Sequence, residues 1–178
     1  MIIKNISTPK ELVEELKKVK SKYGYFEVLQ RMDITLKTFE GYFTWNDENY
    51  TRNCLARTEE FELMLMCWEE GQETLIHDYG EAMAWVHPIC GSIKEERYLL
   101  SDNGTGLVKV SSLGVEKSEF SFLHKTGIHK YINDYEARSV SLHLYVKPVK
   151  TRKIYDCSEG VCKTWSEECT DSSIAVMQ

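Results

Sequence analysis

The chain lacks four features that would place it in a special class. Its 178 residues contain no apolar run approaching the roughly 20 residues that cross a bilayer. They show no internal repeat and no low-complexity segment. They also lack an excess of positive charge, since the formal net charge is −6. A mildly acidic surface disfavours a nucleic-acid or anionic-membrane partner.

A secretory signal is also missing from the start of the chain. The first 18 residues, MIIKNISTPKELVEELKK, become acidic and amphipathic too early for one. We therefore expect a cytoplasmic protein, whose six cysteines are thiols rather than bridges. Cys157, Cys162 and Cys169 cluster near the end without CxxC spacing or a following histidine. This pattern favours thiols in a loose tail over a zinc site.

The composition is that of an ordinary globular domain. Apolar residues make up 42% and aromatic residues 11%, which argues against disorder. A chain of this length buries a substantial core without metals or disulfides as staples. We expect a single domain over residues 1–178, with a helical cap (1–45), a β-barrel (46–156) and a C-terminal tail (157–178).

The periodicity of the chain changes near residue 50. Thr8, Pro9 and Glu11 form a capping-box pattern with proline at the first helical position, so a helix follows. Residues 23–32 and 36–43 favour two further short helices. Beyond residue 50 the apolar period is two, which predicts strands over 61–68, 92–98, 108–110, 128–132 and 140–145. Many short strands after a helical cap indicate a barrel or a sandwich.

Two predicted strands carry candidate metal ligands. In the stretch TLIHDYG, His77 and Tyr79 lie on the same face of a strand. His129 lies far away in sequence, but antiparallel pairing in a barrel can bring it close. An interior imidazole with a vacant nitrogen is a good ligand for iron, copper or zinc. Each histidine alone is equally compatible with a hydrogen-bonded core residue.

Two other stretches carry polar side chains with a specific pattern. Ser141, His143 and Tyr145 alternate onto one face, and each can both donate and accept a hydrogen bond. Arg52 lies at a strand start, where its guanidinium could hold a carboxylate. Ser141, His143 and Tyr145 could instead form a structural polar ladder. Arg52 could instead form a surface ion pair.

Taken together, these stretches resemble a known family. The motifs are YTRN (50–53), LMCWEEG (65–71), LIHDYG (75–80), GIHKYIN (127–133) and SVSLHLY (139–145). They are similar to those of the cysteine dioxygenase type I family of cupins, the thiol dioxygenases. The resemblance runs from about residue 50 to 156, and the helical start suits the N-terminal cap of that family.

The resemblance implies a mainly β fold, a small antiparallel jelly-roll β-barrel with an N-terminal helical cap. It implies one mononuclear iron, as Fe2+, held by three histidines, and a monomer that oxidises a small thiol such as cysteine to its sulfinic acid with O2. His77 and His129 match the first and third iron ligands. Tyr79 stands where the family has its second histidine.

The resemblance also implies roles for six other residues. Arg52 matches the arginine that pairs with the substrate carboxylate, Tyr50 lines the same pocket, and Trp68 matches a pocket-wall tryptophan. Ser141, His143 and Tyr145 match a triad whose tyrosine hydroxyl points toward substrate and oxygen. The arginine at position 52, rather than an amide side chain, favours an α-amino acid thiol such as cysteine as the substrate over longer mercapto acids.

This sequence departs from the family pattern at several positions, of which Tyr79 matters most. Tyr79 could bind iron as a phenolate, stay protonated beside a two-histidine site, or be a core residue of a cupin that binds a small carboxylate ligand without catalysis. Ala84 replaces a cysteine that some members cross-link to the tyrosine corresponding to Tyr145. The proline pair that usually follows SLHLY in the family is altered here to Val146-Lys147-Pro148. His87 is expected to point outward and not to substitute as a ligand.

Overall fold

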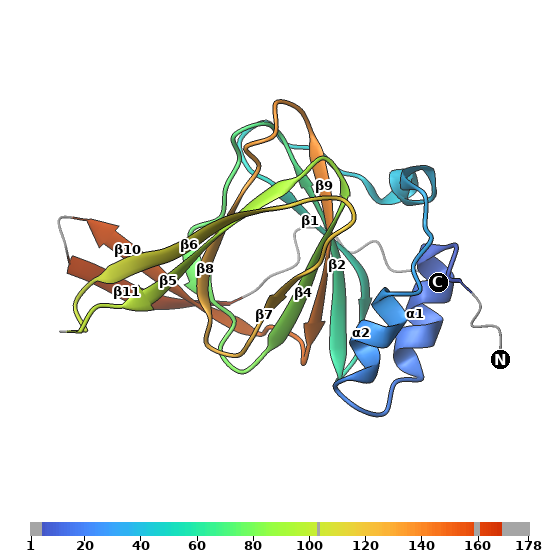
Figure 1. Ribbon diagram of the computed structural model, residues 1–178, viewed down its shortest axis with the longest axis horizontal. Coiled ribbons are helices and arrows are strands. Elements are labelled where there is room, and N and C mark those ends of the chain that lie inside the picture. The colour runs from blue at the N-terminus through green and yellow to red at the C-terminus, as the bar shows by residue number, and fades with distance from the viewer. Residues whose placement is uncertain (1–4, 103, 159–160, 169–178) are drawn as a thin grey trace.

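The computed structural model describes residues 5–102, 104–158 and 161–168 (Figure 1). The helices come first: α1 (Pro9–Lys17), α2 (Gly24–Leu29) and the 3-10 helix η1 (Leu36–Tyr42). The strands follow in this order: β1 (Thr51–Arg57), β2 (Phe61–Trp68), β3 (Ile76–Asp78), β4 (Met83–Cys90), β5 (Ile93–Leu100), β6 (Leu107–Val115), β7 (Ser121–Leu123), β8 (Ile128–Ile132), β9 (Ser139–Val146), β10 (Thr151–Ser158) and β11 (Val161–Glu168). Within this part of the chain, no helix is long and apolar enough to cross a membrane.

The strands form two antiparallel sheets. One sheet has the order β1-β2-β9-β4-β7, and the other has the order β11-β10-β3-β8-β5-β6. Helices α1 and α2 lie beside the sheet that contains β1 and β2 (Figure 1). The mainly β antiparallel architecture with N-terminal helices, predicted from the sequence, is therefore confirmed.

Strands β2 and β9 are buried on both faces because they lie between the helices and the interior of the barrel. Leu63 and Leu65 belong to the core cluster shared with α1 and α2, together with Leu142 and Leu144. The alternate residues face the other way, so Tyr145 packs with a separate interior cluster. This alternation places the Ser-His-Tyr pattern of β9 inside the barrel.

Local signals account for the first helix. Thr8 is the N-cap of α1, and its side chain accepts a hydrogen bond of 3.1 Å from the Glu11 N–H. The Glu11 carboxylate in turn accepts a hydrogen bond of 2.9 Å from the Ser7 N–H. In a standard capping box it would accept from the N–H of the N-cap residue, Thr8, instead. The two later predicted helices form over shorter spans, and the second is a 3-10 helix.

Strand β4 is not among the predicted strands because Pro88 lies inside it. Proline lacks an N–H donor and is normally confined to edge strands or bulges. β4 nevertheless pairs with both β7 and β9, and its register against β9 shifts between Pro88 and Cys90. This irregularity accommodates the missing donor within a central strand.

The prediction of a tail from residue 157 onward is wrong as far as Glu168. Residues 151–158 and 161–168 form the hairpin β10–β11, and β10 pairs with β3, with Ile154 opposite His77. The segment is polar, but Ile154 is fully buried and anchors β10. The thiol prediction holds for Cys54, Cys67 and Cys90, but Cys157 is disulfide-bonded. The side chain of Cys162 and all of Cys169 lie outside the described residues.

Candidate metal centre

The two candidate histidines face each other across neighbouring strands. His77 in β3 pairs with His129 in β8, and their ring centroids are 4.3 Å apart. Both side chains are buried, with 1% and 0% exposure. Antiparallel pairing therefore brings together the imidazoles that the sequence separates.

Both imidazoles have a defined tautomer. His77 Nδ1 lies 2.7 Å from the Leu75 carbonyl oxygen, and His129 Nδ1 lies 3.0 Å from that of Gly127. A carbonyl oxygen can only accept, so each Nδ1 carries the proton and each Nε2 keeps a lone pair. The Nε2 of His129 is buried and has no hydrogen-bond partner among the described residues. A buried acceptor of this kind fits a metal ion, because metal-ligating histidines commonly fix their other nitrogen in this way.

Burial keeps both imidazoles neutral at ordinary pH. It lowers the pKa of His129 to about 4. It also lowers the pKa of His77 well below the usual value, and the neighbouring His129 adds to this effect. Neither ring then has to lose a proton before it binds a cation.

Tyr79 completes the cluster. Its ring centroid lies 4.8 Å from that of His77 and 4.7 Å from that of His129. Among the described residues, no group of three or more His, Cys, Asp and Glu side chains could hold a metal ion. The phenol ring of Tyr79 is in contact with both imidazoles. Burial, followed by the neighbouring phenols of Tyr145 and Tyr131, raises its pKa well above the usual value.

Asp78 lies between the two cluster residues in sequence but belongs to the opposite face of β3. Its carboxylate accepts hydrogen bonds from the Tyr155 hydroxyl at 2.6 Å and from the Gly80 N–H at 2.9 Å. Gly80 has φ = +56°, a conformation that glycine adopts without strain. Asp78 therefore holds the turn that follows β3 and is not part of the metal cluster.

A chain of hydrogen bonds leads to Tyr79 from β9 and β2. The Trp68 indole N–H donates to Ser141 Oγ at 2.9 Å, and Ser141 Oγ lies 2.8 Å from His143 Nε2. The Tyr145 hydroxyl lies 3.4 Å from His143 Nδ1 and 3.3 Å from the Tyr79 hydroxyl. All donors in this chain can point the same way, from the indole toward Tyr79.

Burial also fixes the charge states of this chain. Burial, followed by the charge of Arg52, lowers the pKa of His143 to about 3. Burial raises the pKa of Tyr145 to about 12, against an opposing effect of Arg52. The imidazole and the hydroxyl are therefore neutral at pH 7, and Arg52 is close enough to influence both.

Comparison with known proteins shows the family of the chain. Residues 7–158 match the family model described as "Cysteine dioxygenase type I". The chain belongs to the cysteine dioxygenase type I family.

Relatives within this family are distant. The chain is 28% identical over 123 residues to cysteine dioxygenase type 1 of Homo sapiens, covering 67% of this chain and 62% of the human protein. It is 27% identical over 141 residues to the Danio rerio protein of the same name, covering 72% and 70%. The chain thus spans about three fifths of the length of the curated mammalian relatives that it matches.

Solved structures support the fold. A Klebsiella pneumoniae protein with a double-stranded β-helix domain aligns with a TM-score of 0.52 at 11% identity, over 73% of this chain and 88% of that one. A Thermus thermophilus protein aligns with the same score at 12% identity, over 61% and 93%. With the family match, these likenesses confirm the predicted cupin barrel.

The three other predicted residues, Tyr50, Arg52 and Trp68, lie near this cluster. The ring of Tyr50 stacks on Trp68, with centroids 4.6 Å apart. Tyr50 and Arg52 are half-buried, whereas Trp68 is fully buried. The nine predicted site residues thus gather in one region, although their roles stay predictions.

The predicted departures are located as follows. Ala84 lies opposite Tyr145 in the β4–β9 ladder, so a methyl group stands where some family members have a cysteine. His87 stacks on Phe120 with centroids 4.3 Å apart, and its Nδ1 lies 2.7 Å from the Glu119 carbonyl oxygen. His87 is therefore remote from the cluster, as predicted.

Two buried groups near the centre escaped prediction. Tyr131 is fully buried, its ring centroid lies 4.9 Å from that of His129, and its hydroxyl donates to Glu95 at 3.4 Å. Glu95 also pairs with Arg97 at 2.8 Å and accepts from Ser121. The i, i+2 spacing from His129 could have placed Tyr131 on the same face.

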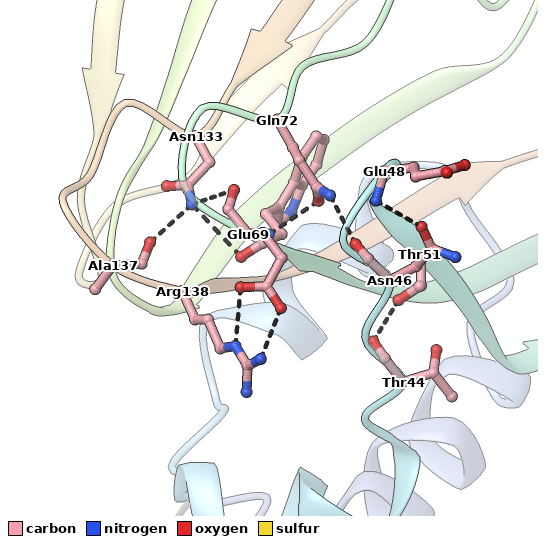
Figure 2. A network of polar contacts seen from close by, with 10 residues as sticks. Thr44, Asn46, Glu48, Thr51, Glu69, Gln72, Asn133, Ala137 and Arg138 are labelled. Atoms are coloured by element: carbon pink, nitrogen blue, oxygen red, sulfur yellow. Dashed lines mark hydrogen bonds and ion pairs between the residues drawn. The ribbon is translucent and has the colours of Figure 1, made fainter.

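Asn133, the last residue of the GIHKYIN motif, has a structural role. Its side-chain amide donates to the carbonyl oxygens of Glu69 at 3.0 Å and Ala137 at 2.9 Å, and Figure 2 shows these contacts. The side-chain carbonyl oxygen of Asn133 accepts a hydrogen bond of 2.8 Å from the Ser139 hydroxyl. Asn133 thereby fixes the loops that follow β2 and β8.

Two surface hollows lie away from the candidate metal centre, against α1 and α2.

Proposed function

We propose that this protein is an iron-dependent thiol dioxygenase that oxidises cysteine or a related small carboxylate-bearing thiol to its sulfinic acid. The observation that carries the proposal is the pair of neutral, opposed imidazoles of His77 and His129, whose Nδ1 protons are held by backbone carbonyls. Its occurrence in a chain of the cysteine dioxygenase type I family selects this chemistry among those that two histidines support.

The residues present fit an iron ion in part. His77 and His129 would bind it through Nε2, and Tyr79 would supply an oxygen. Iron, when bound, supplies open coordination positions and the one-electron chemistry that allows a thiol to react with O2. The buried His129 Nε2 without a hydrogen-bond partner supports this assignment, since such atoms are rare in folded proteins.

Three side chains would bind and orient the substrate. The Arg52 guanidinium matches the planar geometry of a carboxylate and would pair with it. The stacked rings of Tyr50 and Trp68 would form the wall of the pocket and exclude water from the sulfur.

The reaction needs no external reductant. Both oxygen atoms of O2 are transferred to the thiol sulfur, which loses four electrons, while O2 gains four. The Tyr145 hydroxyl, with a pKa of about 12, stays protonated, and its O–H would turn from the Tyr79 hydroxyl to donate a hydrogen bond toward the reacting oxygen atoms. Ser141 and His143 would orient that hydroxyl.

An oxygen electrode provides the test. Protein loaded with Fe2+ is expected to consume O2 when cysteine is added and to form cysteine sulfinic acid in equal amount. Arg52→Met should raise KM at least about tenfold, the effect of losing a charged hydrogen bond. Arg31→Met, which removes an ion pair with Glu15 near α1, serves as the control. No thiol-dependent uptake under any metal loading would exclude the enzymatic function.

One observation favours a second candidate, a cupin that binds a small carboxylate ligand without catalysis. The Tyr79 pKa is raised well above its usual value, so without a metal the phenol is neutral and a poor ligand. Metal analysis of the purified protein distinguishes the two: near-stoichiometric iron supports the enzyme, and metal-free protein that binds a carboxylate supports the binder.

We also propose that the protein is a cytoplasmic monomer of 20.7 kDa. Light scattering would test the monomer by measuring its mass.

A further inference from the structure

Two phenols lie in direct contact beside the candidate metal centre. The Tyr145 hydroxyl donates to the Tyr79 hydroxyl at 3.3 Å. The ring centroids are 4.9 Å apart, and the ring planes meet at 75°. Tyr145 comes from β9 in one sheet, and Tyr79 directly follows β3 of the other sheet. The closed barrel therefore brings together two oxidisable rings that lie 66 residues apart in the chain.

Both rings are shielded from solvent. Tyr79 and Tyr145 have 8% and 1% exposure, and they share one interior cluster with the apolar side chains of Ala84 and Leu123. Exclusion of water protects a reactive group from side reactions. A radical formed on either phenol would therefore meet the other ring before it met a reductant from solution.

The ring of Tyr79 also lies against both candidate metal ligands. Its centroid is 4.8 Å from that of His77 and 4.7 Å from that of His129. Iron held by these imidazoles would supply one-electron chemistry with O2, and phenols are among the side chains that lose one electron most readily. Tyr79 is thus the phenol next to the oxidising centre, and Tyr145 is one hydrogen bond further away.

The position of the two hydroxyls favours one kind of bond. Dityrosine joins two phenol rings through the carbons next to those that carry the hydroxyls, so its two hydroxyls lie side by side. The hydroxyls of Tyr79 and Tyr145 already lie in this way. Groups held at about 3–3.5 Å in a suitable orientation react as if their concentration were very high. The folded chain therefore prearranges the two rings for this bond.

We propose that Tyr79 and Tyr145 form a dityrosine cross-link when the protein holds iron and meets O2. Each phenol loses one electron and one proton, and the two rings then form a carbon–carbon bond. The hydrogen atoms on the two bonded carbons move to the oxygens, so both hydroxyls are restored. O2 accepts the two electrons and the two protons and becomes hydrogen peroxide. The inference shares only the bound iron with the proposed function.

Mass spectrometry tests the proposal. Anaerobic protein is loaded with Fe2+, exposed to O2 without added thiol, and digested with trypsin after its disulfides are reduced. Lys94 and Arg138 lie between the two tyrosines in sequence, so trypsin releases them on different peptides unless they are linked. We expect the protein to lose the mass of two hydrogen atoms and the two peptides to appear as one, with the blue fluorescence of dityrosine. Absence of the joined peptide under any metal loading would overturn the inference.

Variants show which groups take part. Tyr79→Phe and Tyr145→Phe should each abolish the joined peptide. Tyr131→Phe should keep it, because the hydroxyl of this buried phenol donates to Glu95 instead. His129→Ala retains both phenols but removes a proposed ligand, and it should form no joined peptide. A link that persisted in His129→Ala, or one that disappeared in Tyr131→Phe while circular dichroism showed a folded protein, would contradict the proposal.

The outcomes also separate this inference from the proposed function. Thiol-dependent O2 uptake by protein that never forms the joined peptide would overturn the cross-link and leave the dioxygenase supported. The joined peptide without thiol-dependent uptake under any metal loading would establish the cross-link and exclude the dioxygenase.

Discussion

At the scale of single residues, the chemistry of the centre depends on the hydroxyl of Tyr79. Burial raises its pKa, whereas a bound cation lowers the pKa of an oxygen ligand. The second effect is large, since zinc lowers the pKa of water from 15.7 to about 7. A metal at His77 and His129 would therefore favour the phenolate, and binding would release a proton.

Substitution of Tyr79 provides the first prediction. Tyr79→His should bind Fe2+ at least about tenfold more tightly than Tyr79→Phe, because an imidazole donates a lone pair without losing a proton and a phenyl ring donates none. Dialysis against chelator followed by metal analysis measures this. The unaltered protein should lie between the two, and equal retention by the unaltered protein and Tyr79→Phe would exclude the phenol as a ligand.

His143 provides a prediction about pH. Its pKa is about 3 in the folded protein and about 6.5 when unfolded, so the unfolded state binds more protons below pH 6.5. Its contribution to stability is therefore complete above pH 6.5 and is lost as the pH falls toward 3. Between pH 7 and pH 5 the loss is about 2 kcal/mol.

Urea unfolding at the two pH values checks this contribution. In His143→Gln the decrease in the free energy of unfolding from pH 7 to pH 5 should be smaller by about 2 kcal/mol. His124→Gln, at an exposed position, should keep the full decrease. An unchanged decrease in His143→Gln would mean that the imidazole is protonated in the folded state.

Residue-level prediction from sequence worked where a motif was dense. Ser141, His143 and Tyr145 alternate within one strand, so their common face follows from strand geometry. The contact between Arg152 and Tyr50 could not be found in this way, because Arg152 lies in a polar segment and β10 pairs with β3 only in the folded chain. Such pairing joins segments that carry no mutual signal in the sequence.

At the scale of elements, the candidate metal centre depends on a strand of three residues, β3. β3 lies between β8 and β10, and each neighbour pairs with it at His77. So short a strand has few hydrogen bonds of its own, and the packing of its neighbours holds it in place. Ile154, fully buried opposite His77, is the apolar residue of β10 best placed to do so.

Truncation of that residue tests the dependence. Ile154→Ala should lower the free energy of unfolding by about 2–5 kcal/mol, as large-to-small core substitutions do, and should weaken Fe2+ binding as well. Val108→Ala in β6, where the side chain is 53% exposed, should change stability by less than about 0.5 kcal/mol. Chemical denaturation measures both. Unaltered metal affinity in Ile154→Ala would show that β3 is held independently of β10.

The elements predicted well are strands rich in apolar residues that the core buries. β2 and β8 match the predicted ranges 61–68 and 128–132. β4 was missed because Pro88 contradicts a central strand, and β10 was missed because its composition is that of a surface segment. In both, tertiary pairing overrides the local signal.

At the scale of the whole molecule, the centre exists only when the barrel is closed. The six-stranded sheet contributes the two histidines, and the five-stranded sheet contributes Arg52 and the hydrogen-bond chain from β9. The helices cover the outer face of the latter sheet, so its inner face is free to carry polar groups. Folding and site formation are therefore one event in this protein.

Metal binding should consequently stabilise the entire fold. The ligands are distant in sequence and meet only in the folded state, so Fe2+ at about 100 times its dissociation constant adds about 2.7 kcal/mol. For a chain of this size Tm should rise by roughly 5–10 °C, measured by anaerobic thermal unfolding. His129→Ala should abolish the rise. His87→Gln, which alters an imidazole outside the centre, should leave it intact. A rise that persisted in His129→Ala would place the metal elsewhere, and a rise lost in His87→Gln would show that the effect is not specific to the centre.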